Sequence, residues 1–377
     1  MVLTMLIVLA ALWLAYGNGA NDNFKGVATL YGSDTTTFNK ALWWATGTTF
    51  AGSVVSVLFA QKLVKTFSGK GLVPDALAGS PTFAVAVGLG AALTIFLATR
   101  IGMPTSTTHA LIGGLLGTGI AASAQISTSA LLNKFAIPML TSPILAIVIA
   151  GVLYSIFRVA RERSGITKTT CVCVGDGSLQ PVLLQPVQVG SDGALLSSAT
   201  GLELAVDETT QCVERYQGKV VGIEAQQSLD SLHYLSAGAV CFSRAVNDTP
   251  KVAALLLMTA AVTPTVGIGI VGIAIALGGI IQSKKVAETM SKRITDLSPG
   301  QGFTANITTA FLVLVASNMG VPVSTTHVSC GSIFGIGVAT QSGKKDTILK
   351  ILGTWVTTLP LAAIVSGLLY WIFSTTV

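Results

Sequence analysis

The same pair of motifs occurs twice in this chain, and this repetition limits the folds open to it. Residues 104–109 read Pro-Thr-Ser-Thr-Thr-His, and residues 322–327, which begin 218 positions later, read Pro-Val-Ser-Thr-Thr-His. An Asn-Asp pair inside apolar sequence precedes each motif: Asn21 and Asp22, then Asn247 and Asp248. Shorter matches, such as residues 151–157 with 367–373, follow in the same order. The sequence therefore predicts two structural repeats.

Composition places both repeats in a membrane. Hydrophobic residues make up 51% of the chain and charged residues only 10%, against about a quarter in a soluble domain. A bilayer needs about 20 apolar residues per helix. Such segments lie near 1–20, 40–64, 135–158, 232–259, 261–282 and 350–373. The formal charge of +6 comes with no basic stripe or aromatic platform, so we expect membrane lipid and no nucleic acid as a partner.

The first of these segments could be mistaken for a signal peptide. It has no basic region at its start, and residues 17–22 at its polar end match a later internal segment. We therefore expect a retained helix.

Two further apolar stretches, 82–123 and 302–338, are each split by one of the histidine-ended motifs. Their halves are about 15 to 18 residues long, which is short for a span. This favours a helical hairpin that dips into the membrane with its polar tip buried in protein. Two helices that cross completely remain the alternative.

The positive charges predict an orientation. If the hairpins do not cross, each copy spans the membrane three times, and hairpins that cross as two helices keep the number odd. The second repeat is therefore inverted relative to the first. An outside N-terminus places twelve basic residues in the cytoplasm: Lys40, Arg158, Arg161, Arg163, Lys168, Lys284, Lys285, Lys292, Arg293, Lys344, Lys345 and Lys350. It places four outside: Lys62, Lys65, Lys70 and Lys134. This bias follows the positive-inside rule and predicts a multi-pass protein of the cell inner (plasma) membrane.

Residues 164–230, between the copies, have a different composition. They hold most of the acidic residues and short alternating runs separated by turn residues, which predicts a small β-rich soluble insert on the cytoplasmic side. Cys171, Cys173 and Cys212 are then reduced thiols, and we favour structural thiols over metal ligands. The chain thus divides into a first membrane repeat (1–163), the insert and a second repeat (231–377).

Asp22 and Asp248 are the carboxylates inside the apolar segments. An ionised aspartate at the centre of a bilayer costs about 2.5–3.5 kcal/mol, so each needs a partner. One interpretation is a structural ion pair. Lys25 and Lys251 follow the aspartates by three residues, one helical turn, and Arg244 precedes Asp248 by four.

A cation site is the second interpretation. Carboxylate, amide and backbone oxygens suit hard cations, and helix breaks expected at 17–19 and 249–250 would supply free carbonyls. We favour this interpretation because both copies keep Asn-Asp-x-x-Lys. The expected cation ligands are Asn21, Asp22, Asn247 and Asp248. Both interpretations apply if the lysines stabilise the empty site.

The hydroxyl-rich motifs suit an anion. A proline followed by Ser and Thr opens a helix, whose first N–H groups and positive dipole end attract negative charge. Two such turns facing each other would bind a tetrahedral oxyanion through Ser106, Thr107, Thr108, Ser324, Thr325 and Thr326. The simpler interpretation is helix capping. His109 and His327 are either ordinary helix residues or groups that orient the turn or respond to protonation of the bound anion.

Together, Gly-Ala-Asn-Asp at 19–22 and the paired motifs resemble the inorganic phosphate transporter family (PiT), most closely at residues 317–327. The resemblance covers both membrane halves and implies a carrier of inverted repeats that moves phosphate with sodium or protons, commonly as a homodimer. Where the family often continues Val-Ala-Asn, this chain has Asn-Phe-Lys at 23–25. Many sodium-coupled members carry intramembrane glutamates, where Asn306 and Thr49 stand here. The coupling ion is thus left open between sodium, which we favour, and the proton.

The sequence as a whole predicts an all-α polytopic membrane protein with two inverted repeats, each with a broken helix and a polar-tipped hairpin. Its predicted function is secondary import of inorganic phosphate, with sodium ions co-transported and no cofactor. No Gly-x-x-x-x-Gly-Lys-Ser/Thr loop occurs, so ATP hydrolysis is not expected. A sulfate permease of the same family is one alternative. A membrane phosphate-ester enzyme that uses His109 and His327 is another, but no nucleophile or metal cluster accompanies them, so we expect no enzyme.

Overall fold

A computed structural model describes residues 2–58, 60–176, 202–208, 221–257 and 263–376. The chain divides into two compact units, each described by itself: Met1–Ser155 with His233–Val377, and Ile156–Leu232. The first unit holds the apolar helices and both motifs.

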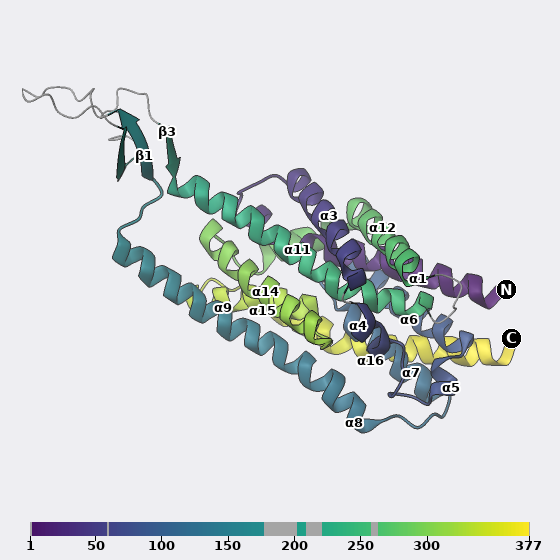
Figure 1. Cartoon of the computed structure of the whole chain (residues 1–377). Coiled ribbons are helices and arrows are strands. Elements are labelled where there is room, and N and C mark those ends of the chain that lie inside the picture. Colours follow the sequence, from purple (N-terminus) through teal and green to yellow (C-terminus); the bar gives the residue numbers. More distant parts are fainter. Residues whose placement is uncertain (1, 59, 177–201, 209–220, 258–262, 377) are drawn as a thin grey trace, which may run out of the picture. The chain divides into compact units, whose positions relative to one another are not determined.

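The long helices follow the same order in the two halves of the sequence (Figure 1). The first half has Val2–Asp22 (α1), Phe38–Val55 (α3), Pro81–Arg100 (α6), Thr107–Ala121 (α7) and Ile137–Ser164 (α9). The second half has Ala225–Leu257 (α11), Pro264–Gln282 (α12), Pro299–Met319 (α14), Thr325–Thr340 (α15) and Lys345–Thr376 (α16). Shorter helices connect them: Ala28–Gly32 (α2), Ala60–Phe67 (α4), Asp75–Ala78 (α5), Thr128–Ala130 (α8) and Lys284–Glu288 (α13).

Seven helical segments of the described chain are long and apolar enough to cross a membrane. They include the helix expected at 1–20 and the first arm of each hairpin. Those arms, α6 and α14, have 20 and 21 residues, so the expectation of 15 to 18 residues was wrong for them. The second arms, α7 and α15, are short, with 15 and 16 residues. The chain is therefore a multi-pass membrane protein built mainly of helices.

The helix breaks differ from those predicted. Helix α1 continues through Gly17 and Gly19, and a 3₁₀ turn, Asn23–Lys25, follows it. A Cβ at Gly19 would overlap the carbonyl oxygen of Ile275, so this glycine serves close helix packing rather than a break. Helix α11 contains Pro250 in its interior and continues to Leu257, so the break predicted at 249–250 was wrong. Buried neighbours allow a proline to remain inside a membrane helix.

Helices from one half of the sequence pack on those of the other. Helix α1 lies against α12, and α16 lies against both arms of the α6/α7 hairpin (Figure 1). Helix α9 packs in turn on α15, where Cβ atoms at Gly331 and Gly335 would meet the carbonyls of Pro143 and Ile147. The last long helix of each half thus covers the other half's hairpin. Because each hairpin is covered by a helix from the other half, the tips of both hairpins lie together.

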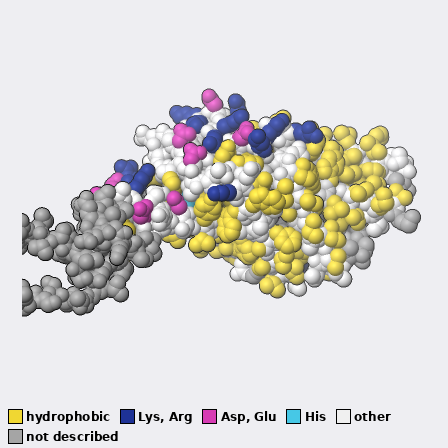
Figure 2. Space-filling view, turned by 90° about the horizontal axis from the view of Figure 1, so that it is seen from above, with side chains coloured by type: hydrophobic (Ala, Val, Ile, Leu, Met, Phe, Trp, Pro, Cys, Tyr) yellow, Lys and Arg dark blue, Asp and Glu magenta, His cyan; other side chains and the backbone are white. Residues whose placement is uncertain are grey.

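Much of the surface is apolar. Large exposed hydrophobic side chains recur along α9, α12 and α16. On the face drawn in Figure 2, charged side chains gather in one part, and many apolar side chains, mixed with uncharged ones, lie beside them. Exposed ion pairs such as Lys292–Asp34 and Lys344–Asp296 involve residues from the set predicted to face the cytoplasm. Broad apolar faces of this kind suit contact with lipid.

The second unit contains a three-stranded antiparallel sheet of Thr170–Asp176 (β1), Leu202–Glu208 (β2) and Val221–Glu224 (β3), in the order β2-β1-β3. The predicted insert boundary at 230/231 falls inside α11, and the compact unit runs from Ile156 to Leu232 instead. Cys171 is a buried free thiol. The side chain of Cys173 and the whole of Cys212 lie outside the described residues.

Candidate functional site

Both histidine-ended motifs open a helix as the sequence predicts. Ser106 has an extended backbone, and its hydroxyl accepts the backbone N–H of His109 at 3.1 Å at the start of α7. Ser324 accepts the N–H of His327 at 3.2 Å at the start of α15. Both serines are therefore N-cap residues, so the capping interpretation applies to them.

The two turns meet in the interior of the protein. The Thr108 hydroxyl donates to the carbonyl of Val323 at 3.2 Å. The Thr326 hydroxyl donates to the carbonyl of Thr105 at 2.5 Å. Each turn thus bonds to the other turn's backbone, and all four residues are buried. The predicted convergence of the two hydroxyl turns is present in the structure.

Lys25 places a cation between an aspartate and both turns. Its ammonium group pairs with the carboxylate of Asp22 and donates to the Thr105 carbonyl at 2.8 Å. It also donates to the Thr326 hydroxyl, from the other half of the sequence, at 2.5 Å. One carboxylate, one carbonyl and one hydroxyl oxygen therefore surround this nitrogen.

Lys251 repeats this arrangement in the second half. Its ammonium group lies 3.2 Å from Asp248 Oδ1 and 2.8 Å from the Val323 carbonyl. It donates to the Thr108 hydroxyl, again from the other half, at 2.8 Å. Both lysines are completely buried. The interpretation as ion pairs is therefore correct for the two lysines, and each pair also links the two hydroxyl turns. Arg244 instead donates to the side chains of Asn18 and Thr49.

Asn18 connects the two aspartates, a role that was not predicted from the sequence. Its side-chain nitrogen lies 3.1 Å from Asp22 Oδ2, 3.4 Å from Asp248 Oδ2 and 2.8 Å from Thr107 Oγ1. Its side-chain oxygen accepts a hydrogen bond from the guanidinium of Arg244 at 3.1 Å. Asn18 precedes Asp22 by four residues, as Arg244 precedes Asp248, and this matching position is the signal that could have identified Asn18.

The remaining threonines of the motifs bond to the carboxylates. The Thr325 hydroxyl donates to Asp248 Oδ2 at 3.1 Å, and the Thr107 hydroxyl lies 3.4 Å from Asp22 Oδ2. The hydroxyls that the sequence assigned to an anion and the carboxylates that it assigned to a cation therefore form one continuous cluster.

Asn21 and Asn247 hold the turns in place. Asn21 donates to the Met103 carbonyl at 3.0 Å and accepts from the backbone N–H of Thr105 at 2.9 Å. Asn247 donates to the Val323 carbonyl at 3.2 Å. Both amides are thus bound to the motif backbones, which is a positioning role. Direct sodium ligation by these two residues stays a prediction.

Five buried side chains with formal charge lie in the described part of the chain: Asp22, Lys25, Arg244, Asp248 and Lys251. All belong to this cluster, and their net charge is +1. A buried charge without a counter-charge is costly, because the interior does not solvate it as water does. The cluster therefore attracts an anion.

The two histidines lie against each other. The ring centres of His109 and His327 are 4.4 Å apart, and the His327 ring stacks on Trp355 at 3.9 Å.

Asn306 belongs to a separate buried network, where its side-chain oxygen accepts a hydrogen bond from Thr29 at 3.1 Å. Thr49, by contrast, reaches the cluster, because Arg244 donates to its hydroxyl at 3.0 Å.

Comparison with known proteins agrees with the resemblance seen in the motifs. The sequence profile of the phosphate transporter family matches residues 18–366. A protein of Thermococcus kodakarensis assigned as a phosphate permease is 26% identical over 97% of this chain and 96% of its own length. The chloroplast inorganic phosphate transporter 2-1 of Arabidopsis thaliana is 26% identical over 97% of this chain and 71% of its own.

A solved structure of a sodium-dependent phosphate transporter has the same fold, with a TM-score of 0.76, 23% identity and complete coverage of both chains. The family and these relatives are transporters and permeases, and none of them is an enzyme. The profile covers both hairpins, both aspartates and the buried cluster between them. This chain therefore belongs to the phosphate transporter family.

Proposed function

We propose that the protein imports inorganic phosphate together with sodium by alternating access. One observation carries the proposal: two hydroxyl turns from opposite halves of the sequence meet at a buried cluster whose net charge is +1. Neutral hydroxyl donors, helix N-termini and buried cations are the groups that bind phosphate in proteins.

Phosphate would bind between the turns. Thr108 and Thr326 are the best-placed hydroxyls, because each contacts a lysine ammonium group on one side and the opposite turn on the other. Thr107 and Thr325 would add donors once the aspartates bind another partner. Ser106 and Ser324 would contribute through the helix ends that they cap.

The lysines would couple the anion to the cation. In the structure, each ammonium group occupies an oxygen cage of the kind that a sodium ion prefers. Phosphate beside Thr326 would draw Lys25 away from Asp22 and leave that carboxylate to sodium. Lys251 and Asp248 would act in the same way. Each ligand then favours the binding of the other, as linkage requires.

Charge balance supports two sodium ions for each phosphate dianion. One sodium at each aspartate adds two positive charges, which cancel the dianion. The loaded and empty sites then carry the same net charge of +1. The change of conformation therefore costs a similar electrostatic free energy with the site loaded and with the site empty, and no additional charge opposes either one.

The repeated order of helices supports two inverted repeats that rock against each other around this cluster. The positive-inside bias supports an outside N-terminus, a cytoplasmic insert and a plasma-membrane location. A homodimer is carried over from the family resemblance alone.

The carboxylates favour phosphate over sulfate. A phosphate dianion carries one O–H group at neutral pH, which can donate to Asp22 or Asp248, whereas a sulfate dianion has no proton to donate. Sulfate would therefore place an acceptor oxygen against a carboxylate oxygen, with no hydrogen bond between them. We therefore expect sulfate to compete weakly.

Uptake into proteoliposomes tests the function. Radioactive phosphate should accumulate against its gradient when sodium is higher outside, and an equal potassium gradient should not replace sodium. Accumulation that follows a pH gradient and ignores sodium would assign the coupling to protons. Equal uptake of sulfate would assign the protein to sulfate transport, and the absence of uptake of either anion would refute the proposal.

Lys25→Met tests the exchange, because it removes the ammonium group and keeps an apolar stem. We expect phosphate affinity to fall about 10- to 100-fold, since a lost hydrogen bond to a charged group is worth roughly 1.5–3 kcal/mol. Sodium should bind more tightly in the absence of phosphate. Lys292→Met is the matched control, because that lysine forms an exposed pair with Asp34. Unchanged affinities in Lys25→Met would show that the lysine has no part in coupling.

A further inference from the structure

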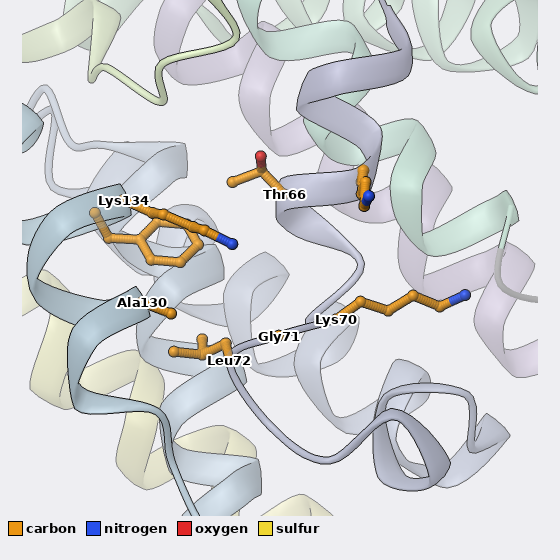
Figure 3. A pocket seen from close by; sticks show the side chains of 8 residues that line it. Thr66, Lys70, Gly71, Leu72, Ala130 and Lys134 are labelled. Atoms are coloured by element: carbon orange, nitrogen blue, oxygen red, sulfur yellow. The ribbon is translucent and has the colours of Figure 1, made fainter.

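A concave site lies apart from the buried cluster. It has a volume of about 240 Å³ and lies between residues 65–72, which include the end of α4, and residues 130–135 (Figure 3). Its lining residues are Lys65, Thr66, Lys70, Gly71, Leu72, Ala130, Lys134 and Phe135. We call this site the lysine pocket. Its volume is ample for a hydrated phosphate ion.

The pocket is positively charged. Lys65, Lys70 and Lys134 line it, and no lining residue is acidic. Lys134 points into the open space toward Thr66, whereas Lys70 extends away along the rim (Figure 3). Within the described chain, none of the three forms an ion pair with a carboxylate. Their charges are therefore available to an anion from solution.

An irregular helical turn presents Lys134. Residues Leu131–Ala136 form a π-helix between α8 and α9. Such turns are rare and are frequent at functional sites. Here the turn places the Lys134 ammonium group across the pocket, 3.7 Å from the position that a Cβ on Gly71 would occupy. A side chain at Gly71 would therefore fill the space in front of this cation.

Two aromatic rings connect the pocket with the buried cluster. Phe135 lines the pocket, is buried, and packs edge-on against Phe67, with ring centres 5.9 Å apart. The Phe67 ring in turn lies under the ammonium group of Lys251, which is 5.5 Å from the ring centre. Lys251 contacts Thr108 and Asp248. The contacts thus run without a gap from the pocket to the proposed phosphate site.

We propose that the lysine pocket is the outer vestibule of the carrier, where inorganic phosphate collects before Phe67 and Phe135 open toward Lys251. This inference rests on the proposed function. The charge pattern supports the outer side, because the three pocket lysines are among the four basic residues predicted to lie outside. A pocket of one charge raises the local concentration of oppositely charged ions and accelerates their association.

Neutralising the pocket tests the vestibule. A triple variant, Lys65→Gln with Lys70→Gln and Lys134→Gln, should lower kcat/KM for phosphate uptake about tenfold at low ionic strength, while kcat is retained. The difference should shrink below about twofold near 1 M salt, where charges are screened within about 3 Å. Lys62→Gln is the matched control, because Lys62 is exposed on the same short helix but does not line the pocket.

The result separates this inference from the proposed function. Unchanged kcat/KM and unchanged salt dependence in the triple variant, with normal phosphate transport by the parent protein, would overturn the vestibule and leave the function intact. Loss of kcat in the triple variant would also count against it, since a vestibule acts before the transport step.

The aromatic pair has its own test. In a cysteine-free background, Thr108→Cys reports access to the buried cluster by a charged, membrane-impermeant thiol reagent. Adding Phe67→Ala should raise the rate of labelling from outside at least tenfold and leave labelling from the cytoplasmic side unchanged. Phe67→Leu, which preserves most of the volume, should raise it less and guards against misfolding. Equal outside rates in all three proteins would show that these rings close no path.

Discussion

The contact between α1 and α12 yields a prediction with a built-in control. A Cβ at Gly278 would overlap the carbonyl oxygen of Tyr16 and approach the backbone nitrogen of Ala20. Gly269 lies nine residues earlier on the same helix, and a Cβ there would meet nothing within 4 Å. Gly278→Ala and Gly269→Ala therefore make the same chemical change on one helix, in a closed and in an open environment.

The expected magnitudes follow from this difference. To relieve the overlap at residue 278, the helices must separate by roughly 1 Å, and overpacking of this kind costs about 1–3 kcal/mol or more. The helical preference of alanine over glycine returns at most about 1 kcal/mol. Gly278→Ala should therefore be destabilised by roughly 1–2 kcal/mol, whereas Gly269→Ala should be unchanged or slightly stabilised.

Phosphate affinity should fall together with stability in Gly278→Ala and stay unchanged in Gly269→Ala, because α1 carries Asn18, Asn21 and Asp22. A misplacement of about 1 Å at a binding group can cost about 100-fold in activity, so phosphate affinity should fall at least tenfold in Gly278→Ala. Thermal unfolding in detergent and calorimetric titration with phosphate measure both quantities. Equal melting temperatures and equal affinities for the two variants would refute the close contact and the argument built on it.

Three further predictions concern the site and the topology. Asp22→Asn and Asp248→Asn should each abolish sodium-dependent uptake in proteoliposomes while the protein still inserts, and sodium dependence like that of the parent protein would exclude these carboxylates as cation ligands. Ser324→Ala should lower the stability by about 1 kcal/mol, because it removes an N-cap, with little change in phosphate affinity; a large loss of affinity at an unchanged melting temperature would instead make this hydroxyl a direct ligand. Thr167→Cys, in a cysteine-free background, should react with an impermeant reagent only from the cytoplasmic side, and labelling of intact cells would reverse the proposed orientation.

The sequence predicted those parts of the site that depend on local chemistry. A proline followed by Ser and Thr opens a helix wherever it lies, so the two N-caps at Ser106 and Ser324 followed from the motif alone. The buried aspartates could be identified because a carboxylate in apolar sequence requires a partner. The spacing to Lys25 and Lys251 supplied that partner, since three residues make about one helical turn.

Contacts between distant segments could not be read in this way. Asn18 was interpreted only as part of a helix break, yet it bonds to both aspartates, and one of them is 230 residues away. The break itself was inferred from Gly17 and Gly19, but Gly19 lets α12 approach and Gly17 faces Ile95 of α6. Pro250 does not break α11 as predicted, because neighbouring segments of the fold allow the helix to continue beyond it. Local rules identify which groups need partners but not where the fold supplies them.

A single difference between the two copies sets the charge of the site. Each half supplies one aspartate and one lysine to the cluster, so these four residues cancel. Four positions before the aspartate, however, the first half has Asn18 and the second has Arg244, and the guanidinium of Arg244 donates to the Asn18 carbonyl. Two asparagines would leave the cluster neutral, and two arginines would leave it at +2. The net positive charge of the cluster, which favours an anion, therefore comes from Arg244, at the position where the repeats differ. The side-chain oxygen that holds Arg244 in place belongs to Asn18, in the other half of the chain.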